Sequence, residues 1–274
     1  MTIKNPLSPA STYHASDGAA YEIFLGRWTK LLAPLVLDFA AFPSQGDLLD
    51  LGTGTGSLAR AMAARWPSRQ ILGIDIAEPY LAYARAQTES PPPQFKVGDA
   101  AALDHDDDAF AGVAAQLVLN FVPNASAAMR EMRRVTRSGG TVVAAVWDFR
   151  GGLVYQRLFW DTAAGIDPGA ADARDRLFSG SLAVPDGLPN LFNAAGLIDV
   201  QRSSLTIRMT YASFDDYWKP LLGGQGPVGT YITALEDGLR RRVEDAVRRA
   251  YYSGSPDGER SLTATAWAVR GTVP

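Results

Sequence analysis

The feature that most constrains the fold is a glycine-rich turn that joins an apolar segment to a helical one. Residues 47–51 predict a short buried strand, and residues 57–66 have the apolar spacing of a helix. Between them, residues 50–56 read Asp-Leu-Gly-Thr-Gly-Thr-Gly. Glycines let a backbone turn sharply and approach a ligand closely, and the N–H groups at a helix start favour an anionic group. The turn therefore predicts a ligand site at the carboxyl end of the strand.

Strands and helices continue to alternate along the chain. Further strands are expected at residues 70–75, 95–97, 113–119 and 141–147, with helices at 79–88 and 125–135. Because the strands are apolar, they predict a parallel sheet with helices on both faces. Before the first strand, residues 20–42 have helical spacing, and Pro34 is expected to divide or kink that helix. After residue 147 the rhythm changes, with helices expected at 189–195 and 235–251 and strands at 200–209 and 262–270.

Aspartates mark three successive strands of the predicted sheet. Asp50 lies at the glycine-rich turn, Asp75 ends the second strand and Asp99 follows the third. A carboxylate in the second position can accept hydrogen bonds from both ribose hydroxyls, and one in the third position can accept from an adenine amino group. One aspartate after a strand is also an ordinary turn residue. The three together predict a nucleotide-binding crevice along one edge of the sheet.

Several segments resemble the class I S-adenosylmethionine-dependent methyltransferases. Residues 48–57 resemble motif I of that family, residues 74–76 (Ile-Asp-Ile) its ribose-binding motif and residues 97–100 (Val-Gly-Asp-Ala) its adenine-binding motif. Residues 121–124 and 129–140 are similar to the stretch before the fifth strand in the small-molecule branch, which is called methyltransferase type 11 or ubiquinone-biosynthesis-like. Residues 21–28 resemble a leader of one subgroup of that branch.

The resemblance implies an α/β, Rossmann-like class I methyltransferase fold. This fold has a seven-stranded, mostly parallel sheet whose last strand is antiparallel, helices on both faces and lid insertions. The implied activity is in-line methyl transfer from S-adenosyl-L-methionine to a small-molecule acceptor. We expect one domain over residues 1–274, with an N-terminal helical cap (1–42), a cofactor-binding core (43–148) and two insertions (149–188 and 211–260) that cover the acceptor.

The resemblance also implies roles for single residues. Gly52, Thr53, Gly54 and Gly56 would wrap the methionine part of the cofactor, and Asp50 would hold its amino group or a nearby water. Asp75 would bind ribose, Ile76 would pack on adenine, and Asp99 and Ala100 would meet the adenine amine. Gln116 would lie beside the amino end, and Tyr21 and Arg27 would close over the carboxylate.

The acceptor site is expected to come from the leader and the insertions, which are rich in aromatic residues that suit a partly apolar small molecule. The candidate acceptor-binding residues are Tyr13, Trp28, Asn120, Trp147, Trp160, Tyr217 and Trp218. Part of this set is expected to pack the insertions against the sheet instead. His14 is the candidate general base, which a hydroxyl or amine acceptor needs and a carboxylate, thiolate or enolate does not.

Composition excludes several other classes of site. The chain has no cysteine, which excludes disulfides, thiolate metal sites and cysteine nucleophiles, and with only two histidines we expect no metal. A net charge of −3 argues against nucleic acid as a partner. No apolar run approaches the length of about 20 residues needed to span a membrane, and no signal peptide is recognised, so we expect a cytoplasmic protein. The oligomeric state stays open.

Two other functions remain open at this stage. One is an NAD(P)-dependent oxidoreductase, but the turn reads G-x-G-x-G rather than G-x-G-x-x-G, and no Tyr-x-x-x-Lys pair follows the fourth strand. The other is a non-catalytic S-adenosylmethionine-binding module. Methylation of nucleic-acid amino groups is disfavoured because residues 120–123 read Asn-Phe-Val-Pro rather than Asn-Pro-Pro-aromatic.

Overall fold

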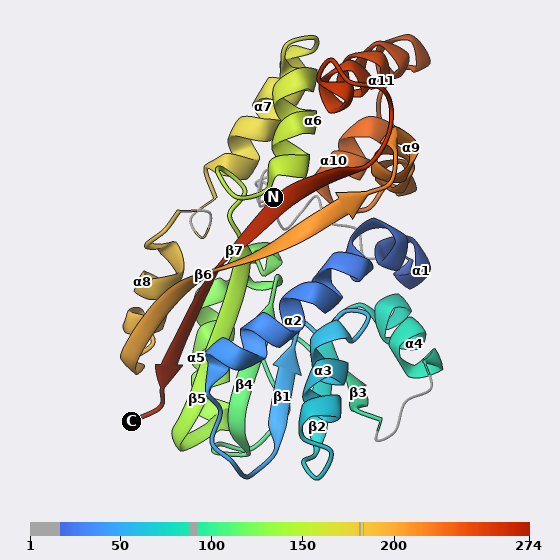
Figure 1. Ribbon diagram of the computed structural model, residues 1–274. Helices are drawn as coiled ribbons and strands as arrows, with labels where there is room; N and C mark the ends of the chain where they lie inside the picture. Colours follow the sequence, from blue (N-terminus) through green and yellow to red (C-terminus); the bar gives the residue numbers. More distant parts are fainter. Residues whose placement is uncertain (1–16, 88–91, 181, 183) are drawn as a thin grey trace, which may run out of the picture.

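A seven-stranded sheet runs through the computed structural model, which describes residues 17–87, 92–180, 182 and 184–274 (Figure 1). In spatial order the strands are β3 (Gln94–Val97), β2 (Ile71–Asp75), β1 (Leu48–Leu51), β4 (Phe110–Gln116), β5 (Thr136–Trp147), β7 (Arg260–Thr272) and β6 (Ile198–Tyr211). The first five run parallel, and β7 is antiparallel to both of its neighbours. This order confirms the predicted sheet, including its antiparallel last strand.

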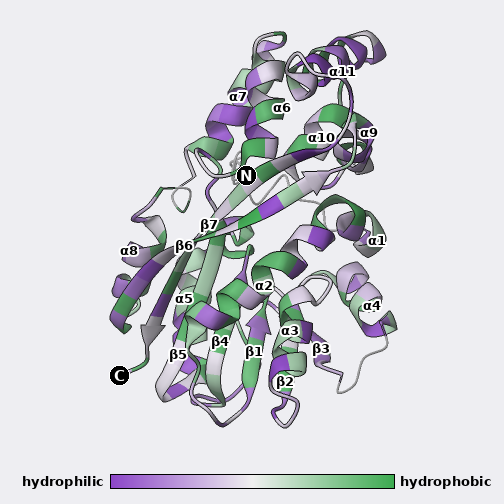
Figure 2. Ribbon diagram, in the orientation of Figure 1, coloured by the Kyte–Doolittle hydropathy of each residue, from purple (hydrophilic) through white to green (hydrophobic). Residues whose placement is uncertain are grey.

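Helices cover both faces of the sheet because alternate side chains of each strand point to opposite faces. On one face Leu48 packs in a cluster with α2 (Arg27–Ala40) and α3 (Ser57–Arg65). On the other face Leu49 and Leu51 pack with α5 (Ala125–Val135) and α8 (Gly187–Ala194). The remaining elements near these layers are α1 (Gly18–Tyr21), the π-helical turn η2 (Glu22–Gly26), α4 (Glu78–Ala86) and the 3₁₀ turn η3 (Leu119–Phe121). Figure 2 shows the apolar central strands between helices with polar outer sides.

A group of helices lies beyond the carboxyl ends of the parallel strands, at the top of Figure 1. It consists of α6 (Val154–Ala164), α7 (Pro168–Phe178), α9 (Phe214–Trp218), the 3₁₀ turn η4 (Lys219–Gly223), α10 (Gly226–Thr233) and α11 (Asp237–Tyr252). Buried aromatic rings hold this group together. Phe159 and Trp160 meet at 5.1 Å between ring centroids, and Phe214 stacks on Trp218 at 5.7 Å.

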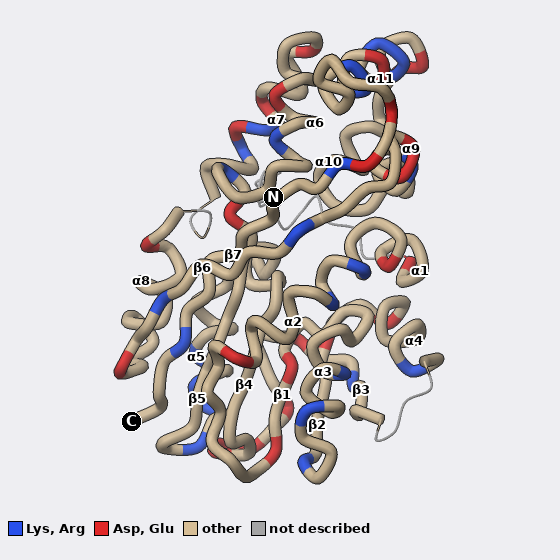
Figure 3. The backbone as a smooth tube through the Cα atoms, viewed as in Figure 1, with Lys and Arg blue, Asp and Glu red and all other residues tan. Residues whose placement is uncertain are grey.

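The helix expected at residues 235–251 is α11 (Asp237–Tyr252), which carries both basic and acidic residues. The structure places α11 at the surface, where its buried residues are Val243, Val247 and Tyr251. Figure 3 shows basic and acidic segments alternating along it. Two ion pairs lie within the helix, from Arg248 to Glu244 at 2.6 Å and from Arg240 to Asp237 at 2.5 Å. The arginines of α11 are therefore interspersed with acidic residues and do not form a purely basic surface.

Three predicted boundaries differ from the structure. The expected division at Pro34 is wrong, because α2 runs through that residue. Pro34 lies on the exposed side of the helix, where water can bind the carbonyl that the missing N–H leaves free. The helical irregularity lies earlier, in η2. Strand β4 ends at Gln116 rather than at residue 119, because Leu117 has a left-handed φ of 64°. Strand β5 begins at Thr136, directly after α5, rather than at residue 141.

Two further features concern membrane spans and metal sites. Within the described part of the chain, every helix is too short or too polar to cross a membrane. In that same part, no group of three or more His, Asp or Glu residues is placed to hold a metal ion.

Candidate active site

A cavity of about 340 Å³ opens at the carboxyl ends of the parallel strands. This volume lies in the range of about 300–1,000 Å³ that is usual for small-molecule sites. Its lining includes Asp99 after β3, Asp75 at the end of β2, Asp50 in β1, Gln116 at the end of β4 and Trp147 at the end of β5. These five residues follow the spatial order of the strands. The cavity therefore runs along the edge of the sheet where open α/β folds bind their ligands.

The glycine-rich turn forms the floor of the cavity. The backbone N–H groups of Gly52 and Thr53 both donate to the carbonyl oxygen of Ile74, at 2.7 and 3.0 Å. Gly52 has a φ of 70°, and a Cβ there would overlap the side chain of Val118, so only glycine fits. Gly54 has a φ of 55°, and a Cβ there would meet only Tyr80, at 3.8 Å. The absence of a side chain at Gly54 leaves the backbone there open to a ligand.

Asp50 carries a carboxylate oxygen that has no partner among the described residues. Its Oδ2 accepts hydrogen bonds from Thr53 Oγ1 at 2.6 Å and from the backbone N–H of Ala59 at 2.9 Å. Its Oδ1 is buried and unpaired. Burial raises the pKa of Asp50 to about 7, and the two hydrogen bonds only partly oppose this effect. A positively charged group near Oδ1 would therefore be strongly favoured.

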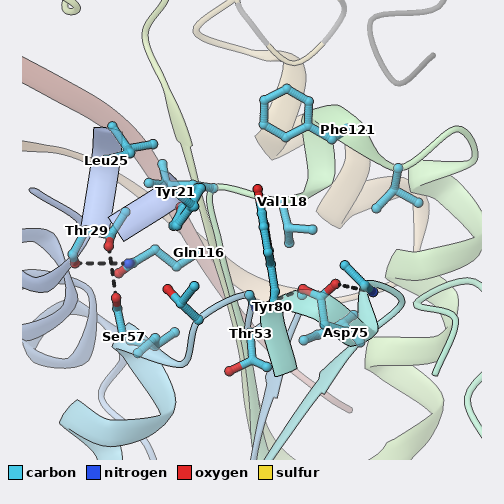
Figure 4. A pocket seen from close by; sticks show the side chains of 18 of the residues that line it. Tyr21, Leu25, Thr29, Thr53, Ser57, Asp75, Tyr80, Gln116, Val118 and Phe121 are labelled. Carbon is cyan, nitrogen blue, oxygen red and sulfur yellow. Dashed lines mark hydrogen bonds between the residues drawn. The ribbon is translucent and has the colours of Figure 1, made fainter. Parts of the chain in front are cut away.

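Asp75 is held in one orientation by the backbone. Its Oδ2 accepts from the N–H of Gly54 at 2.8 Å, and its Oδ1 accepts from the N–H of Ala77 at 2.8 Å (Figure 4). Burial raises the pKa of Asp75, while these backbone hydrogen bonds oppose the increase. The next residue, Ile76, lines the cavity although its side chain is 72% exposed. An exposed apolar side chain beside a fixed carboxylate is suited to a flat ring attached to a sugar.

Gln116 connects the floor of the cavity to helix α2. Its Nε2 donates to the carbonyl oxygen of Thr29 at 3.1 Å, and Thr29 Oγ1 lies 2.9 Å from Ser57 Oγ (Figure 4). The Oε1 of Gln116 is buried without a partner. The side chain is thereby held in place with one amide oxygen left for a ligand.

Aromatic residues from distant parts of the chain form the roof. Tyr21 of α1 packs against Tyr80 of α4 with 5.1 Å between ring centroids. Tyr80 Oη donates to Gln225 Oε1 at 2.9 Å, and Gln225 directly precedes α10. The pKa of Tyr21 is raised, chiefly by burial, so its hydroxyl stays protonated at neutral pH. The N-terminal helices and the second insertion therefore meet above the cavity.

Comparisons with known proteins agree with this geometry. A family model described as a methyltransferase domain matches residues 49–144. A demethylmenaquinone methyltransferase of Roseiflexus castenholzii is 33% identical over 174 residues, which are 59% of this chain and 71% of that protein. The chain belongs to the class I S-adenosylmethionine-dependent methyltransferases.

Two further similarities extend over more of this methyltransferase. An uncharacterized protein of Mycobacterium tuberculosis is 25% identical and covers 90% of this chain and 93% of its own length. A phosphoethanolamine N-methyltransferase of Haemonchus contortus, solved with phosphomonomethylethanolamine and S-adenosylhomocysteine, has a TM-score of 0.58 at 14% identity. It covers 98% of this chain and 58% of the solved one, and it supports the fold alone.

The residues present fit the cofactor of this family, S-adenosylmethionine. Asp50 and Gln116 each leave a buried oxygen unpaired, and both residues line the cavity. Such atoms normally have a partner in a folded protein, so a bound amino group would supply a hydrogen bond that the protein lacks. The space above Gly54 and the fixed carboxylate of Asp75 lie in the same cavity.

Most of the sequence-predicted cofactor residues line the cavity. They are Tyr21, Asp50, Gly52, Thr53, Gly54, Asp75, Ile76, Asp99, Ala100 and Gln116. Gly56 lies behind the turn, where a Cβ would overlap Arg60 and Phe95. Arg27 also lies outside the lining, because its guanidinium pairs with Asp216 at 2.9 Å.

The predicted acceptor residues are more scattered. Trp147 lines the cavity, whereas Trp28, Asn120, Trp160, Tyr217 and Trp218 are not part of the lining. Trp28 packs on Tyr211 at 5.3 Å, and Trp160, Tyr217 and Trp218 are buried among the aromatic rings of the helical group. Tyr13 and His14 lie outside the described residues.

The structure adds lining residues that the motifs did not indicate, above all Gln156, Phe149, Tyr80 and Thr29. One signal for Gln156 exists in the sequence. It lies next to Tyr155 on a helix whose neighbouring turns carry Phe159 and Trp160, so it is a polar residue on an otherwise apolar face.

Proposed function

We propose that this methyltransferase transfers a methyl group to a small-molecule acceptor by in-line displacement. One observation carries the proposal: a single cavity joins a carboxylate-lined region at β1–β3 to an uncharged, partly aromatic region at β4–β5. The first region has the chemistry to hold the cofactor. The second has the size and apolar character of a pocket for a small organic molecule.

The carboxylate-lined region would hold the nucleoside part of the cofactor. Asp75 would accept hydrogen bonds from the ribose hydroxyls, because each of its oxygens has one backbone donor and room for another. Ile76 would pack against the adenine ring. Asp99, which accepts from the N–H of Ala101 at 2.8 Å, would meet the adenine amine together with Ala100.

The floor and the roof would hold the methionine part. The unpaired oxygens of Asp50 and Gln116 would accept from its ammonium group, which would also favour the charged form of Asp50. The backbone from Gly52 to Gly54 would lie against it. The ring of Tyr21 would close over it from the other side.

The chemistry needs alignment more than acid–base help. S-adenosylmethionine, when bound, supplies a methyl group on a positively charged sulfur, and that sulfur keeps the bonding electron pair as the acceptor attacks the methyl carbon. The protein would hold the acceptor in line and exclude water. Among the described lining residues there is no His, Lys, Arg or Glu side chain. The assignment of His14 as a general base stays a prediction.

The N-terminal helices and the second insertion would act together as a cover over the methyl group. Two contacts support this proposal. Tyr21 packs against Tyr80, which is hydrogen-bonded to Gln225, and the ring of Phe24 lies close to Gly226. Water competes with the acceptor for an activated methyl group, so a cover on this side of the sheet would serve the reaction directly.

Calorimetry and a turnover assay test the proposal. We expect S-adenosylmethionine and S-adenosylhomocysteine to bind without added metal, NAD to give no signal, and at least one small acceptor to increase S-adenosylhomocysteine formation above the acceptor-free background. Tight NAD binding with no response to S-adenosylmethionine would contradict the proposal. Cofactor binding without turnover over a broad acceptor panel would instead favour a non-catalytic binding module.

A further inference from the structure

Besides Gln116 Oε1, which the proposed function assigns to the cofactor, two buried polar atoms lack partners at the β4–β5 end of the cavity. Trp147 ends β5, and Gln156 lies in the first turn of α6. Both residues line the cavity and are only 3% and 4% exposed. Among the described residues, neither Trp147 Nε1 nor Gln156 Oε1 has a hydrogen-bond partner. Because buried polar groups are nearly always paired in folded proteins, this end of the cavity has an unfilled requirement for hydrogen bonds.

The surrounding contacts hold the side chain of Gln156 in place. Gln156 Nε2 donates to Tyr155 Oη at 3.0 Å, and the carbonyl oxygen of Tyr155 accepts from Tyr217 Oη at 2.8 Å. Whichever way the amide of Gln156 is turned, only one of its two polar atoms can meet Tyr155 Oη. In either orientation of the amide, Gln156 in the first turn of α6 therefore keeps one unpaired nitrogen or oxygen atom.

The rest of this end is apolar and carries no charge. Phe24, Leu25, Phe149 and Pro227 contribute to the lining. The charged side chains of the whole described lining are Asp50, Asp75 and Asp99, all on β1–β3 or directly after β3. A phosphate, carboxylate or ammonium group on the acceptor would leave water without meeting an opposite charge here. Burial of an unpaired charge is strongly unfavourable.

We propose that Trp147 and Gln156 select an uncharged acceptor that carries a hydroxyl or carbonyl oxygen on an apolar ring or chain. The inference rests on the proposed function of the same cavity. The indole N–H of Trp147 donates to the acceptor's oxygen, and the free amide atom of Gln156 makes the second hydrogen bond. The apolar lining residues bury the body of the acceptor. The two residues therefore recognise the acceptor and are not expected to hold the cofactor.

Binding to the protein saturated with S-adenosylhomocysteine tests this without relying on turnover. The probes are a naphthol, naphthalene, and the same naphthol carrying a sulfonate on its far ring. By calorimetry, we expect the naphthol to bind at least about tenfold more tightly than either of the others, because naphthalene lacks the hydrogen-bonding group and the sulfonate is charged.

Two variants and one matched control assign the effect to these residues. Gln156→Leu and Trp147→Phe should each weaken naphthol binding by about tenfold while binding of S-adenosylhomocysteine changes less than about twofold. Gln45→Leu is the control, because Gln45 is an exposed glutamine in the loop before β1, at the opposite end of the strands. It should bind all three probes as the parent does. If one variant fails to fold, the other gives the same test.

The outcomes separate this inference from the proposed function. Loss of S-adenosylhomocysteine binding by the parent protein would overturn the proposed function itself. Normal S-adenosylhomocysteine binding with equal affinity for the naphthol and its sulfonate, or for the naphthol and naphthalene, would overturn only the selection of an uncharged acceptor. Unchanged naphthol binding in both variants would show that Trp147 and Gln156 do not recognise it.

Discussion

The two ends of the cavity differ in charge and in how the chain builds them. At the β1–β3 end, each carboxylate lies at or directly after the end of a strand, and the backbone or a neighbouring threonine holds it. At the β4–β5 end, the lining comes from separate parts of the chain, which include the N-terminal helices, the segments after β4 and β5, α6 and the first turn of α10. That end has no charged side chain among its described residues.

This difference predicts that substitutions at the two ends of the cavity will have different effects on folding and on ligand binding. The β1–β3 end depends on a fixed backbone path, so a substitution there affects both folding and ligand binding. The β4–β5 end is a surface made where insertions meet. Its side chains can vary without changing the sheet, as is common where loops on a rigid scaffold carry specificity. Substitutions at the two ends should therefore separate cofactor binding from acceptor binding.

The largest expected effect is at the glycine-rich turn. Gly52→Ala places a Cβ against Val118 at a φ of 70°, so both left-handed strain and overlap oppose folding. We expect a loss of about 2–5 kcal/mol in unfolding free energy, with loss of cofactor binding. Gly139→Ala is the matched control, because Gly139 has a φ of 72° and nothing within 4 Å of a Cβ. Equal destabilisation of the two variants in thermal denaturation would contradict a role for the contact with Val118.

The next largest effect is expected at Asp50, which makes the unfolding free energy depend on pH. Because its folded-state pKa is raised from 3.8 to about 7, the folded protein binds more protons than the unfolded chain between these values. The contribution of Asp50 to the unfolding free energy is therefore fully present below about pH 4. This contribution is lost as the pH rises to about 7. The slope reaches about 1.4 kcal/mol per pH unit.

Asp50→Asn should remove this contribution, since an amide does not titrate and its oxygen can still accept from Thr53 and Ala59. Denaturant unfolding across the same pH range measures the slope for the parent and the variant. Asp104→Asn is the control, because Asp104 is 97% exposed and pairs only with Lys96. A parent protein whose stability does not decline between pH 4 and 7 relative to Asp50→Asn would show that Asp50 is ionised in the fold.

Asp75→Ala tests the β1–β3 end for cofactor binding. A hydrogen bond to a charged group contributes about 1.5–3 kcal/mol, so affinity for S-adenosylmethionine should fall about ten- to a hundredfold. Acceptor binding should change much less. Asp104→Ala serves as the control, and calorimetry gives both affinities. If Asp75→Ala binds the cofactor as the parent does, Asp75 only orients the backbone of Gly54 and Ala77.

The difference between the two ends of the cavity also explains which parts of the site could be predicted from the sequence. The alternation of strands and helices, the glycine-rich turn and the positions of Asp50, Asp75 and Asp99 follow from local patterns. The antiparallel last strand was implied by the family resemblance. Pro227 and Tyr155 reach the cavity only through the packing of the insertions, which no short-range pattern encodes. Of the two outcomes expected at Pro34, a division of the helix was wrong for a related reason, since the effect of a proline depends on which side of α2 faces solvent.

Tyr217→Phe tests whether the helical group supports the acceptor end. The change removes the hydrogen bond from Tyr217 Oη to the carbonyl oxygen of Tyr155 and leaves the ring in place. We expect a loss of about 1 kcal/mol in unfolding free energy. The Michaelis constant for the acceptor should rise while the dissociation constant for the cofactor stays constant. An equal change in both constants would show that the two ends of the cavity are not independent.

The smallest effect is expected at Arg27, which the leader motif assigns to the cofactor's carboxylate. In the structure its guanidinium pairs with Asp216 at 2.9 Å and lies 4.2 Å above the ring of Trp28. Both partners of the ion pair are about one-third exposed, so solvent weakens it, and Arg27→Gln should cost below about 1 kcal/mol in unfolding free energy.

If the cofactor's carboxylate draws the guanidinium of Arg27 away from Asp216 on binding, calorimetry will instead show a much larger loss of S-adenosylmethionine affinity than of stability. Asp216→Asn distinguishes the two cases, because it removes the negative charge of the ion pair and so makes the guanidinium easier to draw to the cofactor. Affinity that is unchanged in Asp216→Asn and strongly reduced in Arg27→Gln would place Arg27 in the cofactor site, and small effects in both variants would leave it as a surface ion pair between the N-terminal helices and the second insertion.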